Sequence, residues 1–447
     1  MKKIVLSIAA VMAAAAFAPE ASALPEFARQ TGMACSACHF QHFPLLNGFG
    51  RAFKSAGYTM MGAQGKIEGE ELSIPDTLNL GVFTTVGFQT QSNNNAVGNA
   101  ATATNGGPVP KWLVPGTGGE LSIFFGGRIS EFAGFLAELP LGSAAATPAV
   151  AAGTNVAAGL AGSAKLAMLF PVGDARVGMV AYSNQGQGAA YSFEILNTGA
   201  VGTHKMMGNT GPSNQHDHAA YAAQYLNTKT DASGLSFVAN NTMGFVNIGR
   251  YEAAGNNVVG GANTLPLTYA RVAGTFDLAG FDAAVGIQNF SGSSNVTNVT
   301  TKATIIDGQM QGEVAGYPAG FYVGYGRAPA VALVGLNTGN MFNASTSVAT
   351  STLNVAAELG LIPHGTVQVA LRSASRDAVD GASTLGGTTG VAGTQTKDNA
   401  LLLGATYELA QNMGLSLHYT TQSGSYWANQ VTPVGKTATT LLLEAAF

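Results

Sequence analysis

The sequence predicts an all-β protein: a transmembrane antiparallel β-barrel of about 16 strands, preceded by a small and mostly helical domain. Three observations predict this fold. Apolar and polar residues alternate along much of the chain after residue 76. Charged residues make up only 10% of the 447 residues, while 59 are glycine. Short turns also alternate with long polar loops. A wall that faces lipid on one side and water on the other produces this combination.

The first 23 residues have the form of a secretory signal peptide. An apolar run up to Phe17 follows Lys2 and Lys3, and Ala23 ends a small-residue cleavage site. The run is shorter than the roughly 20 apolar residues that a spanning helix needs. We therefore expect export from the cytoplasm, a mature chain that begins near Leu24, and a final location in the outer membrane.

The alternation that indicates barrel strands is clearest near the C-terminus. Val367, Val369 and Leu371 alternate with more polar residues, and the last strand carries an apolar face that includes Leu441 and ends at Phe447. An even number of strands would bring both ends of the barrel to the periplasmic side. We expect strands to begin near residues 77, 119, 131, 163, 175, 218, 235, 266, 281, 302, 320, 350, 366, 398, 415 and 437.

The connections between the predicted strands fall into two classes. Short turns are expected at residues 278–280, 318–320, 363–365 and 411–414, and long polar loops at 93–115, 184–217 and 377–397. Short turns on one side and long loops on the other are typical of outer-membrane barrels. Four charged residues are expected to line the interior: Glu131, Asp307, Glu313 and Arg372.

Residues 24–75 differ in composition from the barrel, which we assign to residues 76–447. A helix is expected here: Pro44 fits a first helical turn, Phe49 and Phe53 recur at helical spacing, and Gly57 can end the helix. A domain of about 50 residues buries little hydrophobic core by itself, so we expect a covalent cofactor to stabilise its fold.

The motif Cys35-Ser36-Ala37-Cys38-His39 has the Cys-x-x-Cys-His pattern by which c-type haem is attached. Cys35 and Cys38 would form thioethers with the haem, and His39 would be the proximal ligand of its iron. The alternatives are a redox-active cysteine pair or half of a zinc site. The first favours a βαβ setting and the second needs two more ligands nearby, and neither is evident in the sequence.

The second axial ligand of such a haem is less well defined by the sequence. Met60 follows the predicted helix and a bend, so the chain can return over the other haem face. Met61, Met33, His42 or no residue at all are the alternatives. His42 follows His39 by three residues, which suits contact with a propionate better than ligation of the distal face.

One long loop contains a candidate binding site for a ferrous ion. His216 and His218 flank Asp217, and such nitrogen and oxygen ligands suit Fe(II). A solvated polar loop is the alternative interpretation. The net charge of −4 and the absence of basic clusters in the sequence give no indication of nucleic-acid binding.

The stretch PEFARQTGMACSACHFQHFPLLNGFGR, which begins at Pro25, and its continuation to Gly57-Tyr58-Thr59-Met60 resemble the fused monohaem cytochrome–porins of the outer membrane. The match covers residues 25–60, and the remainder corresponds in architecture only. This family is regarded as the iron oxidases of Fe(II)-oxidising bacteria. The resemblance implies one covalent haem c held by Cys35, Cys38 and His39. It also implies electron flow from extracellular Fe(II) to a periplasmic c-type cytochrome.

The leading hypothesis is therefore an outer-membrane iron:cytochrome-type oxidoreductase that works by electron transfer, without acid–base chemistry. A haem-gated passive porin and the same conduit running outward to an extracellular acceptor are the alternatives. Because a single haem at the inner rim cannot span a lipid-facing band about 25 Å tall, we expect residues 24–75 to lie inside the barrel as a plug.

Overall fold

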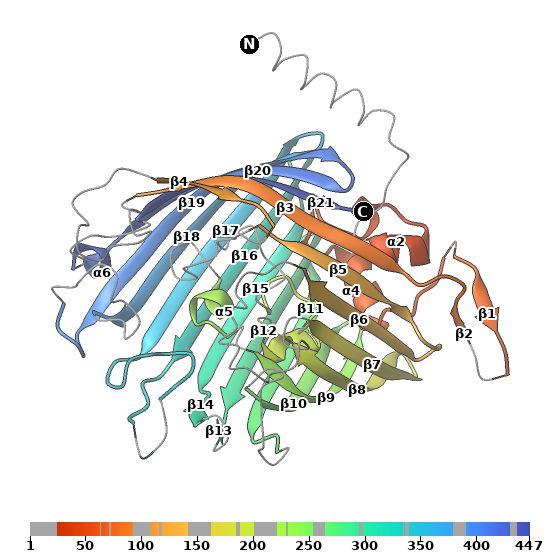
Figure 1. The fold of residues 1–447 in the computed structure, drawn as a ribbon, viewed down its shortest axis with the longest axis horizontal. Helices are drawn as coiled ribbons and strands as arrows, with labels where there is room; N and C mark the ends of the chain where they lie inside the picture. Colours follow the sequence, from red (N-terminus) through yellow and green to blue (C-terminus); the bar gives the residue numbers. More distant parts are fainter. Residues whose placement is uncertain are drawn as a thin grey trace, which may run out of the picture.

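The chain folds into a closed barrel with short helices at one end of its interior (Figure 1). The computed structural model describes residues 25–62, 64–70, 73–92, 109–115, 119–141, 162–184, 188–200, 221–228, 231–253, 264–294, 298–333, 335, 339–378, 390–429 and 436–447. Within these ranges, every helix is too short or too polar to cross a membrane.

Each strand of the wall is antiparallel to its neighbours, and β21 pairs with β3 to close the barrel. Both β4 and β5 pair with β3, at Gly87–Gln91 and Leu80–Thr84, so they share one position in the wall. The 17 strands of the described wall thus make 16 positions, as predicted. They are β3 (Leu80–Gln91), β4 (Val109–Leu113), β5 (Leu121–Arg128), β6 (Ala133–Pro140), β7 (Ser163–Val172), β8 (Ala175–Asn184), β9 (Ala232–Asn241), β10 (Gly244–Glu252), β11 (Leu267–Leu278), β12 (Phe281–Ser291), β15 (Ala303–Val314), β16 (Tyr317–Ala328), β17 (Thr350–Ile362), β18 (Gly365–Asp377), β19 (Gln395–Ala410), β20 (Met413–Ser423) and β21 (Thr437–Ala446).

Two predicted details of the wall are wrong. The start of the strand predicted near residue 218 lies outside the described residues, but its described continuation, Ala222–Tyr225, forms the helix α5, and β9 and β10 take the positions predicted at 218 and 235. The sequence there is rich in alanine, the best helix former. The turn expected at 318–320 lies instead at Ala315-Gly316, where both residues have positive φ, and Pro318 belongs to β16.

The two faces of the wall have opposite polarity. On β18, Val367, Val369 and Leu371 are 41%, 40% and 54% exposed on the outside, whereas Gln368 and Arg372 are buried on the inside. The predicted alternation is therefore present. Its apolar side faces outward, as in a strand that contacts lipid.

The two ends of the barrel differ in the length of their connections. The short turns, such as those between β11 and β12 and between β17 and β18, lie at the end where the chain enters β3 and leaves β21. Phe447 continues the closing pair, because its backbone exchanges hydrogen bonds of 2.9 and 2.7 Å with Val82. The long connections lie at the opposite end, where β13 (Ser293–Ser294), β14 (Val299–Thr300) and α6 (Ser425–Ala428) are found.

Residues 25–62 form a helical module against the inner wall at the short-turn end (Figure 1). It contains α2 (Pro25–Thr31), α3 (Cys35–Cys38) and α4 (Gly48–Ser55). Arg51 donates to Gln311 at 3.0 Å and pairs with Asp282. His42 contacts Glu358 of β17, two strand positions from β15 in the wall. The expected plug is thus formed by residues 25–62, whereas β1 (Lys66–Glu68) and β2 (Ser73–Pro75) form a hairpin beyond the module.

The main helix of the module begins later than predicted, at Gly48 instead of Pro44. Asn47 is the N-cap: its side-chain oxygen accepts from Gly50 N at 3.0 Å. Asparagine is a preferred capping residue because it satisfies a free helical N–H group. The end is as predicted, since Gly57 follows the helix with φ +69°.

A second inward segment comes from the connection between β8 and β9. It includes η2 (Ala189–Ser192), the residues up to 200, and α5 (Ala222–Tyr225). Ser192 bonds to Ser236 and Asn247 of the wall, each at 3.0 Å. Leu46 N donates to Asn197 Oδ1 at 2.8 Å, so this segment packs directly on the helical module.

Candidate functional site

A cavity of about 400 Å³ lies between the helical module and the barrel wall. We call it the module cavity. Its size is within the range of pockets for small molecules and cofactors. Cys35, Cys38 and His39 all line it, so the structure brings together the three residues of the predicted attachment motif.

The two cysteines are held on α3, which packs against α4. The two do not form a disulfide; Cys35 is buried and Cys38 is partly exposed. An ideal Cβ on Gly50 would lie 2.2 Å from Cys38 O, so only glycine permits this approach of α4. The close contact fixes the position of Cys38 at the wall of the cavity.

His39 has the environment of a histidine that ligates a metal through its Nε2 atom. Its Nδ1 atom lies 3.1 Å from the carbonyl oxygen of Leu45, which can accept the Nδ1 proton and leaves Nε2 without a proton. Burial lowers the pKa of His39 to about 4, although the Leu45 carbonyl acts in the opposite direction. The imidazole is therefore neutral at neutral pH, as ligation requires.

Aromatic side chains form much of the remaining wall. Phe27 stacks on Tyr58 with ring centroids 5.2 Å apart, and it meets Phe53 edge to face at 5.0 Å. Phe124 and Leu136 add apolar surface from β5 and β6. Such a lining suits a large planar apolar group with a few polar substituents.

A few polar groups also line the module cavity, and the sequence did not single them out. Lys54 comes from α4 and Tyr191 from the inward segment, while Glu120, Ser122 and Glu138 come from the wall. Ser122 donates to Glu120 and to Glu138, at 3.3 and 3.2 Å. Lys54 could have been found by its spacing, because it follows Gly50 by four residues on the same helix face.

The predicted distal ligand, Met60, does not line the module cavity. It packs instead beside the cluster of Phe53, Tyr58 and Leu136, and Gln30 bonds to its backbone oxygen at 2.8 Å. Met33, one of the alternatives, does line the cavity. A methionine in an aromatic-rich region commonly serves as packing, and Met60 does so here.

His42 points away from the module cavity, toward the barrel wall. Its Nε2 atom lies 2.9 Å from Glu358 Oε2, and both side chains are buried. Burial disfavours the charged form of His42, but the Glu358 carboxylate outweighs this and raises its pKa. The predicted propionate contact is therefore not supported, and His42 fastens the module to β17.

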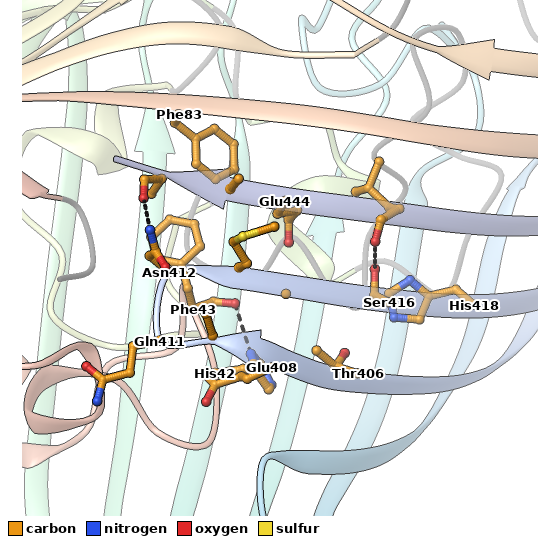
Figure 2. A pocket seen from close by; sticks show the side chains of 16 residues that line it. His42, Phe43, Phe83, Thr406, Glu408, Gln411, Asn412, Ser416, His418 and Glu444 are labelled. Carbon is orange, nitrogen blue, oxygen red and sulfur yellow. Dashed lines mark hydrogen bonds between the residues drawn. The ribbon is translucent and has the colours of Figure 1, made fainter. Parts of the chain in front are cut away.

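Phe43 separates the module cavity from a second pocket, of about 50 Å³, at the short-turn end. Figure 2 shows His42 and Phe43 in this pocket beside Phe83, Glu408 and Glu444. Phe43 contacts His39 on one side, at a centroid distance of 5.3 Å, and Phe83 on the other, at 5.6 Å.

The predicted Fe(II) contacts His216, Asp217 and His218 lie outside the described residues. Within the described ranges, no group of three or more histidine, cysteine, aspartate or glutamate side chains is arranged to hold a metal ion.

Two ion-pair clusters, which we call the lumen clusters, occupy the interior beyond the module. In one, Arg271 lies between Glu194, at 3.0 Å, and Asp307. In the other, Arg372 pairs with Asp398 at 2.5 Å. The predicted interior positions of Asp307 and Arg372 are thus confirmed.

Glu131 and Glu313 are both exposed near short turns, where water can solvate a carboxylate. On β15, Glu313 has the same parity as the inward Asp307 and Gln311, so it lies on the inward face at the rim of the barrel.

The comparisons with known proteins concern the barrel only. No family model and no curated protein matches the chain. Among solved structures, the outer membrane channel DcaP of Acinetobacter baumannii is 10% identical, with a TM-score of 0.46 over 86% of this chain and 100% of that chain. A loop-deletion mutant of the outer membrane protein OmpT of Vibrio cholerae is 7% identical, with a TM-score of 0.45 over 83% of this chain and 99% of that one. A mutant of the Rh. blastica porin is 13% identical, with a TM-score of 0.43 over 83% of this chain and 100% of that chain. The strand pairing itself, and not these distant likenesses, defines the fold.

Proposed function

We propose that this protein is an outer-membrane electron-transfer protein that carries one covalent haem c. Its proposed activity is oxidation of extracellular Fe(II), with a periplasmic c-type cytochrome as electron acceptor. The observation that carries the proposal is the convergence of Cys35, Cys38 and His39 on a single apolar cavity. When bound, a haem c supplies a metal centre that accepts and releases one electron.

The residues of the cavity fit this cofactor. Cys35 and Cys38 lie one helical turn apart on α3, as attachment at two points requires. His39 presents Nε2 while Leu45 holds its Nδ1 proton. The aromatic lining removes water from the cavity, and burial and hydrogen bonding of this kind adjust reduction potentials in proteins.

The proposed location is supported by the outer surface of the barrel. Large apolar side chains point outward along the wall, among them Val355, Leu371 and Leu403, which are 48–54% exposed. Exposed apolar area of this extent is unfavourable in water and is expected of a surface that faces lipid.

A passive channel for small solutes is the second candidate, because a closed barrel is sufficient for such a function. The interior contacts of the module argue for restricted passage. Residues 25–62 reach the wall on opposite sides, at Leu169 and at Glu358, and the segment at 188–200 packs on them.

The deciding experiment follows the visible spectrum of the oxidised protein in detergent while Fe(II) is added without oxygen. We expect rapid reduction in the natural protein. The haem spectrum should be absent from the Cys35→Ala/Cys38→Ala variant, and His39→Ala should lose rapid reduction by Fe(II). Dithionite serves as the control reductant for haem that is present.

A haem that dithionite reduces but excess Fe(II) leaves oxidised would reject the iron-oxidase proposal. A protein without covalent haem that conducts ions in planar bilayers would favour the passive channel. Met243→Leu, at an exposed position in the turn between β9 and β10, is a matched variant that should behave as the natural protein does.

A further inference from the structure

Lys54 is the one lysine among the described residues that lines the module cavity. It lies in the last turn of α4. The side chain is withdrawn from bulk water, and its accessible part faces the cavity. Burial lowers its pKa to about 8, with Glu194 acting in the opposite direction. An ammonium group in such surroundings needs an anionic partner.

The protein itself offers Lys54 no close partner among its described residues. No carboxylate there lies within ion-pair distance of its ammonium group. Glu194, which raises its pKa, is already paired with Arg271 at 3.0 Å. Among the described residues, the charges of the lumen clusters pair with one another, whereas the Lys54 ammonium has no such ion pair.

The neighbouring lysine, Lys165, is engaged differently. Its Nζ atom donates to Tyr191 O at 2.8 Å and lies 3.6 Å from the centroid of the Tyr191 ring. It also lies 5.9 Å from the Tyr58 ring centroid, behind the cavity lining. Lys165 is therefore held by Tyr191 behind the cavity lining, whereas Lys54 lines the cavity itself.

The position of Lys54 along α4 indicates which part of a cofactor it would meet. Gly50 lies against Cys38, and Lys54 follows one helical turn later, about 6 Å further along the axis. The propionates of a haem lie on the edge opposite the two thioether bonds. Lys54 and the attachment residues thus line the same cavity about one helical turn apart along α4, so a haem attached at Cys35 and Cys38 that fills the cavity could bring its propionate edge to the Lys54 ammonium.

We propose that Lys54 binds a propionate carboxylate of the haem in the module cavity. This inference rests on the proposed function, because it requires the covalent haem. The contact is a charge-assisted hydrogen bond from the Lys54 ammonium to a carboxylate oxygen. It holds the haem edge in place and offsets the negative charge that the propionate would otherwise exert on the iron.

The test is a redox titration of the haem-loaded protein and of Lys54→Met. Loss of the cation leaves the propionate charge uncompensated, which stabilises ferric iron over ferrous iron. We expect the ratio of reduced to oxidised haem at a fixed ambient potential to fall roughly tenfold, equivalent to a midpoint about 59 mV lower for one electron. Lys54→Arg should retain the natural ratio, and Lys66→Met, on the exposed β1–β2 hairpin, is the matched control.

An unchanged ratio in Lys54→Met would overturn the inference. So would an altered spin state in its absorption spectrum, because that result would mean that the Lys54 amine ligates the iron itself. If Lys54→Met does not fold, Lys54→Gln replaces it, with the gel mobility of the folded barrel as the check. A natural protein with no covalent haem would instead refute the proposed function, and is distinguished by its missing visible spectrum.

Discussion

The module cavity and the lumen clusters are enclosed by the same wall, yet they differ in whether their buried charges form ion pairs. In the lumen clusters, Arg271 and Arg372 each face carboxylates at ion-pair distance. In the module cavity, Lys54 shares a largely apolar lining with Glu120 and Glu138, yet no described carboxylate is in ion-pair contact with it. A buried charge that is fully paired stabilises one arrangement of the chain, whereas one without a partner marks a place where a ligand can supply it. By this difference, the lumen clusters stabilise the fold, whereas the module cavity is a candidate binding site.

The sharpest test of this comparison removes one cation from each region. Arg271→Met leaves Glu194 and Asp307 buried without their partner, and we expect a loss of about 3–5 kcal/mol in the free energy of unfolding. Lys54→Met leaves no unpaired carboxylate, and we expect a change below about 1 kcal/mol. Urea titrations read by gel mobility of the folded barrel would measure both. Arg327→Met, at an exposed site of β16, is the control, and equal losses at Arg271 and Lys54 would contradict the distinction.

A second test concerns Glu26, an acid in the module. It is fully buried, and among the described residues no other residue forms a hydrogen bond with its carboxylate. Burial raises its pKa from 4.5 to about 7, while its own backbone N–H and Arg29 act in the opposite direction. Between these pH values the folded protein holds more protons than the unfolded chain, so stability is expected to fall as pH rises.

Glu26→Gln should remove this pH dependence. A pKa change from 4.5 to about 7 corresponds to roughly 3 kcal/mol, so the variant should exceed the natural protein in stability by up to that amount at pH 8. The relative gain should vanish as the pH falls to 4. Urea midpoints at several pH values would measure it, with Glu131→Gln on the surface as the control. Parallel pH profiles for the natural protein and Glu26→Gln would disprove the assignment.

The smallest expected effect concerns the helix that carries Lys54. Asn47 accepts from Gly50 N at 3.0 Å and donates to Ala37 O at 3.0 Å, so it joins α4 to α3. Asn47→Ala should cost about 1 kcal/mol, whereas Asn47→Ser keeps a capping oxygen and should cost less. Urea midpoints would measure the loss. Equal stability of the two variants would show that the cap contributes little.

The sequence predicted the wall better than its connections. The outward apolar face of β18 follows from alternation alone, because a two-residue period leaves only one assignment of faces. The strand expected near residue 218 failed because an alanine-rich segment folds inward as α5, and its contacts with β16 and β17 are distant in sequence. Local pattern contains no information about such contacts.

In the candidate site, too, the sequence predicted the local motif but not the residues that the fold brings to it. The grouping of Cys35, Cys38 and His39 follows from their spacing, so the motif identified it directly. The lining residues Lys54, Tyr191 and Glu138 come from three separate segments, and only the closed wall brings them together. Met60 was placed by its distance along the chain, and it packs against Tyr58 and Leu136 instead.

The way in which the module spans the interior bears on how the protein assembles. Gly57 lies beside Leu169 of β7, Arg51 reaches β12 and β15, and His42 reaches β17, so the module touches early and late strands alike. The last wall strand, β21, must still pair with β3, which follows the module and the β1–β2 hairpin in the chain. Packing of the module against the wall and pairing of β21 with β3 are therefore expected to occur in one cooperative step. The module would then help to position β21 for this pairing.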